Sequence, residues 1–245
     1  MRHSDSVVII PARIGSTRLS RKILADINGM PLIIRTMSKL IGENVCDVFV
    51  ATDSEEIAQA VEIAGGNAIM TDPELQSGTD RVYAAYKKLS KQYDYIVNVQ
   101  GDMPNIKPST VWQVLSLVKN NPFVDISTAV CKFPISEEVA KSNIVKAVIS
   151  NSESSNNLNK ALYFSRSQIP YGSEYYYYHL GLYGYNKDSL RKFVSLKPSV
   201  LEQTEKLEQL RAMENGMSIY CVEVGSFPIS VDVPEDLEQA RKEIL

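Results

Sequence analysis

The chain has 245 residues, 44% of them hydrophobic, and its 26 Lys and Arg against 29 Asp and Glu give a net charge of −3. This length suits one α/β domain, with a small subdomain, that buries a core without disulfides or metal ions. The nearly balanced charge argues against a nucleic-acid footprint and a polybasic membrane surface, so a basic site in this chain must be local.

The first half of the chain alternates short β-branched runs with amphipathic helical patterns, which predicts a doubly wound, largely parallel sheet. Strands are expected at 7–10, 47–52, 67–70 and 95–99, and helices at 31–40, 54–64 and 80–89. Pro11 is expected to stop the first strand. Ligands in such sheets bind beyond the carboxyl ends of the strands, where segments 11–22 and 77–81, Asp53 and Asp102 all fall.

The second half of the chain is less regular, and some of its strands are expected to be antiparallel. Strands are expected at 125–131, 144–149, 176–185 and 218–224, and helices at 200–216 and 234–245. The polar stretch 150–160 is expected to form a hairpin tip or a loop. We therefore expect a single domain over residues 1–245 with a small β-rich region at about 125–190. The apolar runs 126–130 and 175–183 are candidates for an exposed dimer contact.

The cysteines and the N-terminal segment bear on where the protein resides. Cys46, Cys131 and Cys221 are far apart, with no CxxC and no His at metal-ligand spacing, so we expect buried, reduced thiols. The first apolar run begins at Val7 and meets Pro11 almost at once, which leaves no room for a signal-peptide core. No later apolar run is long enough to span a bilayer. We expect a soluble, cytoplasmic protein without membrane insertion.

The segment VVIIPARIGSTRLSRKIL places Arg13, Arg18 and Lys22 in a Gly/Ser/Thr loop directly after the first expected strand. Small residues let backbone N–H groups face an anion. Two guanidinium forks and one mobile ammonium suit the oxygens of a triphosphate. The loop is neither a dinucleotide fingerprint nor a Gly-Lys-Ser/Thr phosphate loop. From this loop alone, a solvated basic turn remains an equal alternative.

Two carboxylates are candidates for a magnesium site. Asp102 follows a buried strand and precedes Met103-Pro104, and Asp232 precedes Pro234 at the end of the last expected strand. Mg²⁺ takes few protein carboxylates and completes its octahedron with water and phosphate oxygens. Singly, Asp102 reads better as a turn residue and Asp232 as a helix N-cap. Together with a basic loop at the same sheet edge, they favour the metal site.

Other polar residues have both a binding and a structural interpretation. The turn QSGTDR, residues 76–81, opens a helix whose N-terminus suits an anion or a base edge, or is an ordinary N-cap. His179 in HLGLYGY, with Tyr183, flanks a pocket or is a hydrogen-bonded structural histidine. Glu208 adjoins Gln209 on an expected helix. No nucleophile is paired with a base, since a Gly-x-Ser-x-Gly elbow is absent and neither His lies beside a Cys.

Nine segments follow one another along nearly the whole chain: IIPAR-x-x-STRL, ADINGMPLI, VATDSEEIAQAVEIAGG, QSGTDR, VNVQGD, ALYFSRSQIP, HLGLYGY, LEQTEKLEQLR and VDVPEDLE. In this order they resemble the 3-deoxy-manno-octulosonate cytidylyltransferase (CMP-Kdo synthetase) family. The resemblance implies a mostly parallel, mixed α/β sheet of nucleotide-diphospho-sugar transferase type with a small antiparallel subdomain, and a homodimer. It also implies transfer of CMP from CTP to the anomeric hydroxyl of Kdo, with Mg²⁺ and release of pyrophosphate, for lipopolysaccharide biosynthesis.

The resemblance implies roles residue by residue. Arg13, Arg18 and Lys22 match triphosphate-binding positions, and Asp102 and Asp232 match the magnesium ligands, so Arg13, Lys22 and Asp102 are the expected catalytic residues. The positions that match the surroundings of the cytidine are Gln76, Ser77 and Arg81. The positions that match the sugar side are Arg166, His179, Tyr183, Glu208 and Gln209. In-line attack by a sugar hydroxyl on the α-phosphorus needs neutralised charge and placement, so the missing nucleophile is expected.

The chain departs from the family pattern in two places. The family's Leu-Pro-Gly-Lys-Pro-Leu is Leu-Ser-Arg-Lys-Ile-Leu at residues 19–24, which loosens the unbound loop while Arg21 adds a compensating cation. The family's QGDEP is QGDMP here, with Met103 beside the expected metal site. Metal affinity or the exact sugar acid is therefore open. The alternatives are a sialic-type keto acid, an 8-amino analogue of Kdo, or a catalytically weak binding protein.

Overall fold

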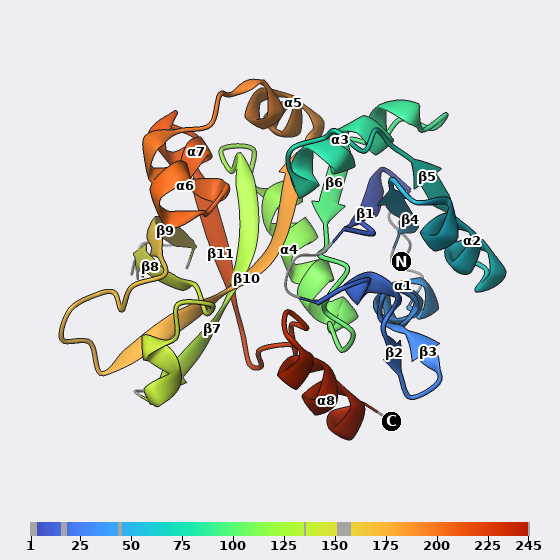
Figure 1. The fold of residues 1–245 in the computed structure, drawn as a ribbon. Coiled ribbons are helices and arrows are strands. Elements are labelled where there is room, and N and C mark those ends of the chain that lie inside the picture. The colour runs from blue at the N-terminus through green and yellow to red at the C-terminus, as the bar shows by residue number, and fades with distance from the viewer. Residues whose placement is uncertain (1–3, 16–18, 44–45, 135, 151–157, 245) are drawn as a thin grey trace. The chain divides into compact units, whose positions relative to one another are not determined.

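The computed structural model describes residues 4–15, 19–43, 46–134, 136–150 and 158–244, and Arg18 of the expected site lies outside them. The chain divides into two compact units (Figure 1). Unit 1 comprises residues 1–112 and 228–245, and unit 2 comprises residues 113–227. Among the described residues, no helix is both long and apolar enough to cross a membrane.

Unit 1 is built on a parallel sheet, as the alternating pattern predicted. Its strands are β1 (Ser6–Ala12), β4 (Asp47–Thr52), β5 (Ala68–Met70) and β6 (Tyr95–Asn98), in the order β5-β4-β1-β6. Helices α1 (Leu32–Gly42), α2 (Glu55–Ile63) and α3 (Gly78–Lys88) pack against these strands. The central strand β1 is buried along its whole length, as expected for a parallel strand covered on both faces.

The expectation that Pro11 stops the first strand is wrong. Strand β1 continues through Pro11 to Ala12, and Pro11 keeps its register with Ala51 of β4. The ladder between β1 and β6 has already ended at Ile9 and Asn98. A proline, which lacks the N–H donor, is tolerated where one side of a strand has no ladder partner. Because β1 ends at Ala12, Arg13 is the first residue after the strand.

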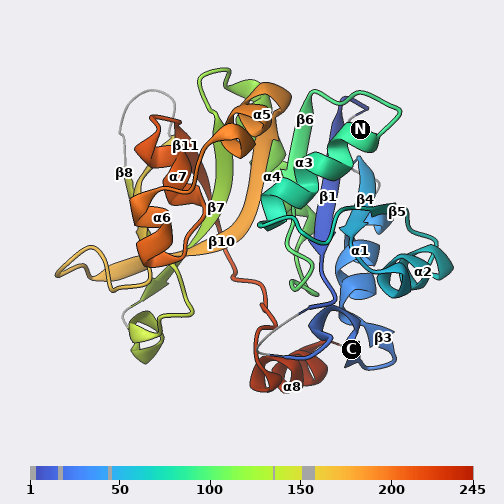
Figure 2. The ribbon, with the colours of Figure 1, turned by 45° about the horizontal axis from the view of Figure 1, so that its top comes forward.

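A hairpin and the last helix close unit 1. Strands β2 (Asp26–Ile27) and β3 (Met30–Pro31) flank Asn28 and Gly29, whose φ values of 50° and 83° suit the tight Asn-Gly hairpin turn. Helix α8 (Pro234–Glu243) lies beside β2 (Figure 2). The Asn28 side chain donates to the carbonyls of Arg241 at 2.7 Å and Ile244 at 2.8 Å. These hydrogen bonds attach the C-terminal end of α8 to the β2–β3 hairpin of unit 1.

Unit 2 contains β7 (Ile126–Pro134), β8 (Lys146–Ser150), β9 (Asn159–Ser165), β10 (Tyr175–Asn186) and β11 (Ile219–Val224). They run in the order β10-β7-β11-β9-β8, and β8 also pairs with β10, so the set closes on itself. All these pairings are antiparallel except β11 with β7, which confirms the expected mixed sheet. Helices α5 (Lys187–Ser195), α6 (Val200–Glu205) and α7 (Gln209–Glu214) belong to this unit (Figure 2).

Two expectations for the second half of the chain are wrong, and several elements were not expected. The helix expected at 200–216 is two helices, α6 and α7, because Lys206 adopts a left-handed conformation with φ of 56°. The runs 126–130 and 175–183 are not exposed edges, since β7 is paired on both sides and most of both runs is buried. Helices α4 (Pro108–Asn120) and α5 and strand β9 were not expected at all.

Candidate active site

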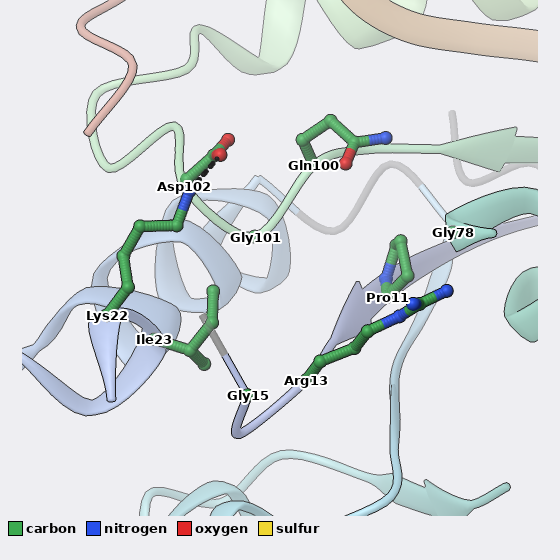
Figure 3. Close-up of a pocket in the computed structure, with 9 residues that line it drawn as sticks. All are labelled: Pro11, Arg13, Gly15, Lys22, Ile23, Gly78, Gln100, Gly101 and Asp102. Carbon is green, nitrogen blue, oxygen red and sulfur yellow. Dashed lines mark hydrogen bonds and ion pairs between the residues drawn. The ribbon is translucent and has the colours of Figure 1, made fainter. Parts of the chain in front are cut away.

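A pocket of about 230 Å³ lies at the carboxyl ends of β1 and β6, the edge that the sequence predicted (Figure 3). Arg13, Lys22 and Asp102 line it, as does Gly78 in the first turn of α3. The remaining lining residues are Pro11, Gly15, Ile23, Gln100 and Gly101. The expected catalytic residues therefore share one pocket of unit 1.

Lys22 lies between the two expected magnesium ligands. Its Nζ donates to Oδ2 of Asp102 at 2.8 Å and to Oδ1 of Asp232 at 2.9 Å. All three side chains are largely buried, with exposed fractions of 13%, 19% and 27%. Burial alone lowers the pKa of Lys22, but the charges and hydrogen bonds of Asp102 and Asp232 outweigh it and raise that pKa. The ammonium is therefore fully charged.

Backbone contacts bring the two carboxylates together from distant parts of the chain. The amide of Val231 donates to the carbonyl of Asp102 at 3.0 Å. Thr36 Oγ1 donates to the carbonyl of Gly101 at 3.1 Å. A Cβ at Gly101 would lie 3.1–3.3 Å from Ile33, Ile23 and the carbonyl of Pro11, so a larger residue would push this turn away.

Asp232 lies neither at a strand end nor at the N-cap of a helix, so both expected positions in the fold were wrong, whereas its role as a magnesium ligand stays a prediction. The preceding strand, β11, ends at Val224, and the N-cap of α8 is Val233. Asp236 accepts from the amides of Asp232 at 2.8 Å and Val233 at 3.0 Å, and so satisfies the N-terminus of α8. The Asp232 carboxylate is left to face Lys22.

Arg13 and Arg81 are near each other but have different surroundings. Arg13 is half-buried, and within the described part of the chain its Nη2 has no hydrogen-bond partner. Arg81 is completely buried, with Nη2 paired to Oδ2 of Asp53 at 2.8 Å and Nη1 bonded to Thr71 Oγ1 at 2.5 Å. Burial lowers the pKa of Arg81, Asp53 opposes that effect, and the charge of Arg13 adds to it. Arg13 thus offers its Nη2 to the pocket, whereas both Nη atoms of Arg81 are engaged and only its Nε lacks a partner among the described residues.

The expected cytidine residues on the turn before α3 satisfy local hydrogen bonds. Ser77 is the N-cap of α3, with its Oγ accepting from the amide of Asp80 at 3.0 Å and its own amide donating to Asp80 Oδ2 at 3.1 Å. Gln76 is exposed, and its Nε2 donates to the carbonyl of Glu74 at 2.9 Å. The capping interpretation of Ser77 is correct, and contacts with a base stay a prediction for both residues.

The two departures from the family pattern lie at either side of the pocket. Arg21 precedes the 3₁₀ turn η1 (Lys22–Leu24) and takes a left-handed conformation, φ 53° and ψ 30°. The family's glycine adopts this region without steric cost. Arg21 also pairs with Glu56 on α2. Met103, next to Asp102 in the sequence, is buried, 5% exposed.

Four of the expected sugar-side residues gather in unit 2. His179 and Tyr183 on β10 have ring centroids 5.5 Å apart. Glu208 and Gln209 lie at the start of α7, and the Glu208 carboxylate adds to burial in raising the pKa of Tyr183. Gln209 is 4% exposed, and its Nε2 has no hydrogen-bond partner among the described residues. Buried amide donors rarely stay unpaired, so Gln209 points to a polar ligand.

Arg166 serves the fold at the end of β9. Its Nε donates to the carbonyl of Glu205 at 2.9 Å and its Nη2 to the carbonyl of Lys206 at 3.3 Å, while Nη1 reaches the carbonyl of Ser142 at 2.8 Å. These bonds hold the break between α6 and α7, and so fix where Glu208 begins the next helix.

Two residues around the site were not among the site residues expected from sequence. Asp53 accepts from the amide of Ile14 at 3.3 Å as well as from Arg81, so it connects the basic loop to α3. Its place directly after a predicted strand was the available signal. Thr128 Oγ1 lies 2.9 Å from Nε2 of His179 and 2.7 Å from the carbonyl of Leu182. Nothing local marks Thr128, because the bulge in β10 creates that contact.

Three comparisons bear on identity. The family model described as Cytidylyltransferase matches residues 7–219. The 3-deoxy-manno-octulosonate cytidylyltransferase of Rickettsia bellii is 46% identical over 244 residues, covering 99% of this chain and 97% of that protein. That of Rhodospirillum rubrum is 45% identical over 237 residues, covering 96% and 94%.

Solved structures agree with the sequence comparisons. The structure of a CMP:2-keto-3-deoxy-manno-octonic acid synthetase complexed with CTP has a TM-score of 0.87 and 39% identity, and the match covers 98% of each chain. A cytidylyltransferase from Leptospira borgpetersenii, 16% identical with a TM-score of 0.63, shares the fold alone. Since both the family model and the full-length relatives match most of its residues, this chain is a nucleotidyltransferase that belongs to the 3-deoxy-manno-octulosonate cytidylyltransferase family.

Proposed function

We propose that this enzyme activates Kdo by transferring CMP from CTP to its anomeric hydroxyl, giving CMP-Kdo and pyrophosphate for lipopolysaccharide biosynthesis. One observation carries the proposal beyond family membership. Lys22, Asp102 and Asp232 converge at the same pocket as Arg13, which has an unpartnered donor among the described residues. This charge arrangement suits a triphosphate with a divalent cation.

Arg13 and Lys22 supply the positive charge that phosphoryl transfer needs. Nη2 of Arg13 donates to phosphate oxygens, and its fixed charge stabilises the pyrophosphate as it leaves. The Lys22 ammonium lies on a flexible stem and follows the phosphate charge as it redistributes. Arg18 is assigned to the same triphosphate, as the resemblance implies. The first turn of α3 at Gly78 adds the positive end of a helix dipole.

The residues present fit a magnesium ion. Asp102 and Asp232 already direct carboxylate oxygens at one cation, the ammonium of Lys22, and both are hard oxygen donors. The described residues contain no group of three or more potential metal ligands, so water and phosphate oxygens complete the coordination. When bound, Mg²⁺ neutralises phosphate charge and lowers the pKa of the attacking hydroxyl. Asp102 and Asp232 hold and orient it.

In unit 2 we assign His179, Tyr183, Glu208 and Gln209 to the sugar acid. Burial lowers the pKa of His179 to about 3, so its imidazole is neutral and acts as a hydrogen-bond partner. Gln209 Nε2 is a donor awaiting an acceptor, and the Glu208 carboxylate accepts from hydroxyls. The carboxylate of the sugar acid needs a cation, and Arg166 is the assigned candidate, although its guanidinium now holds backbone carbonyls.

We place the enzyme in the cytoplasm, where nucleoside triphosphates are held, and propose a homodimer because the family resemblance implies one. Light scattering at working concentration tests the dimer, and a monomer there would count against it.

Pyrophosphate release with CTP and Mg²⁺ tests the activity. Kdo, its 8-amino analogue and N-acetylneuraminate are offered in parallel, with UTP as the nucleotide control. Release with CTP and Kdo alone is the expected result. Release only with another sugar would support cytidylyl transfer but would show that the substrate is that sugar and not Kdo. Failure with every sugar would contradict the proposal and favour a nucleotide-binding protein with an altered 19–24 loop.

A further inference from the structure

The ammonium of Lys22 lies where a divalent cation would have to bind. Its Nζ takes both carboxylates, Asp102 at 2.8 Å and Asp232 at 2.9 Å, and the approach to Asp102 is visible in Figure 3. Both ion pairs are largely buried, so solvent screens them weakly. Neither is the kind of exposed pair that contributes little.

A divalent cation and this ammonium exclude each other at the two carboxylates. Mg²⁺ needs its oxygen ligands at about 2.1 Å, closer than an ammonium hydrogen bond allows, so it takes the same space between them. Like charges a few ångströms apart in a partly buried site also repel strongly. Binding the cation therefore requires Lys22 to leave, and Lys22 leaves readily only if another anion receives its charge.

We propose that Lys22 blocks the divalent-cation site in the nucleotide-free protein and that the triphosphate opens it by drawing the ammonium onto phosphate oxygens. The inference rests on the proposed function, because it takes CTP as the incoming anion. Its consequence is an order of binding: the cation enters with the nucleotide or after it. Without nucleotide, Lys22 occupies the two carboxylates and neutralises their charge, so the site does not take up a cation.

The test measures cation binding directly, without nucleotide and without turnover. Mn²⁺, a spectroscopic substitute for Mg²⁺, is titrated into wild-type protein and the Lys22→Met and Lys22→Gln variants, and free Mn²⁺ is read by electron paramagnetic resonance. Arg21→Ala is the matched control. It also removes one positive charge next to Lys22 in the sequence, but Arg21 pairs with Glu56 and not with Asp102 or Asp232. Circular dichroism checks that each variant is folded.

Both Lys22 variants should bind Mn²⁺ at least about tenfold more tightly than wild type, the ratio that one charge-assisted hydrogen bond is worth. Arg21→Ala should match wild type. Adding Asp102→Asn to Lys22→Met should abolish the gain, which assigns it to these carboxylates. Equal Mn²⁺ affinity in wild type and in a folded Lys22 variant would overturn the inference. Pyrophosphate release by the wild-type enzyme is measured separately, so equal Mn²⁺ affinities would leave the proposed function intact. If the wild-type enzyme released no pyrophosphate while the Lys22 variants bound Mn²⁺ tenfold more tightly, the proposed function would fail and the inference about Lys22 would stand.

Discussion

The buried ion pair between Asp53 and Arg81 gives the sharpest prediction for stability. Arg81 has no exposed surface, and Asp53 is its charge partner at 2.8 Å. Burial already lowers the pKa of Arg81, as does the charge of Arg13, and Asp53 opposes both. Asp53→Asn would remove the ion-paired counter-charge of a buried guanidinium that lies next to another cation, and only the more weakly acting charge of Asp72 would remain. Removing one partner of a buried pair costs about 3–5 kcal/mol. Because the amide still accepts one hydrogen bond, we expect a loss near 3 kcal/mol.

Urea unfolding measures the loss, with far-UV circular dichroism and the fluorescence of Trp112, the single tryptophan, as independent probes. Coincident transitions are needed before a free energy is assigned, since the chain has two units. Asp188→Asn is the matched control, because Asp188 pairs with Arg191 on α5 while both are about two-thirds exposed, 67% and 70%. That change should cost less than about 1 kcal/mol. Equal losses in the two variants would refute the argument from burial.

Three further predictions concern the site and its surroundings. Asp102→Asn should lower turnover at least about 100-fold, the usual effect of losing one electrostatic stabiliser, while circular dichroism stays unchanged; near-normal turnover would remove the metal assignment. Arg21→Gly should raise the free energy of unfolding in urea by about 0.5–1 kcal/mol, because a φ of 53° is strained for arginine but not for glycine, and the lost ion pair with Glu56 is exposed. A lower free energy of unfolding in the variant would show that the ion pair outweighs the backbone strain. The pKa of His179 is lowered from 6.5 to about 3 in the folded protein, so below pH 6.5 the unfolded chain binds a proton that the folded chain does not. The contribution of His179 to stability should therefore be fully present above that pH and fall by about 1.4 kcal/mol per pH unit between about pH 6 and 4. His179→Gln should flatten this part of the stability profile, and identical profiles of the two proteins would mean that His179 is not kept neutral.

The sequence predicted that Arg13, Lys22 and Asp102 lie close together, because the geometry of a parallel sheet determines most of this arrangement. Residues that directly follow parallel strands meet at one edge, so Arg13 after β1 and Asp102 after β6 are brought together without any knowledge of packing. The same logic failed for Pro11, since tolerance of a proline depends on where the neighbouring ladder ends. The burial of all three cysteines was also predicted correctly.

Features set by distant contacts could not be predicted. Helical periodicity continues across 200–216, and the break at Lys206 is stabilised by Arg166, which lies 40 residues earlier, directly after β9. Asp232 faces Lys22 only because Val231 bonds to the Asp102 backbone. Arg81 looks like an available cation in a polar turn, yet its partner Asp53 lies 28 residues earlier, directly after β4. In each case a contact with a segment far away in the sequence decides the outcome.

The route of the chain explains why the candidate site contains a carboxylate from its last segment. The chain leaves unit 1 after residue 112 and returns at 228, so Asp232 meets Lys22 across 210 residues, against 80 for Asp102. Closing the longer loop costs only about 0.9 kcal/mol more in an ideal chain, because this entropy grows with the logarithm of length. The Asn28 bonds to the end of α8 and the core of Ile27, Val231 and Leu237 offset that cost locally. Unit 2 can therefore be inserted between the two carboxylates without weakening the site, since the contacts that align Asp232 all belong to unit 1.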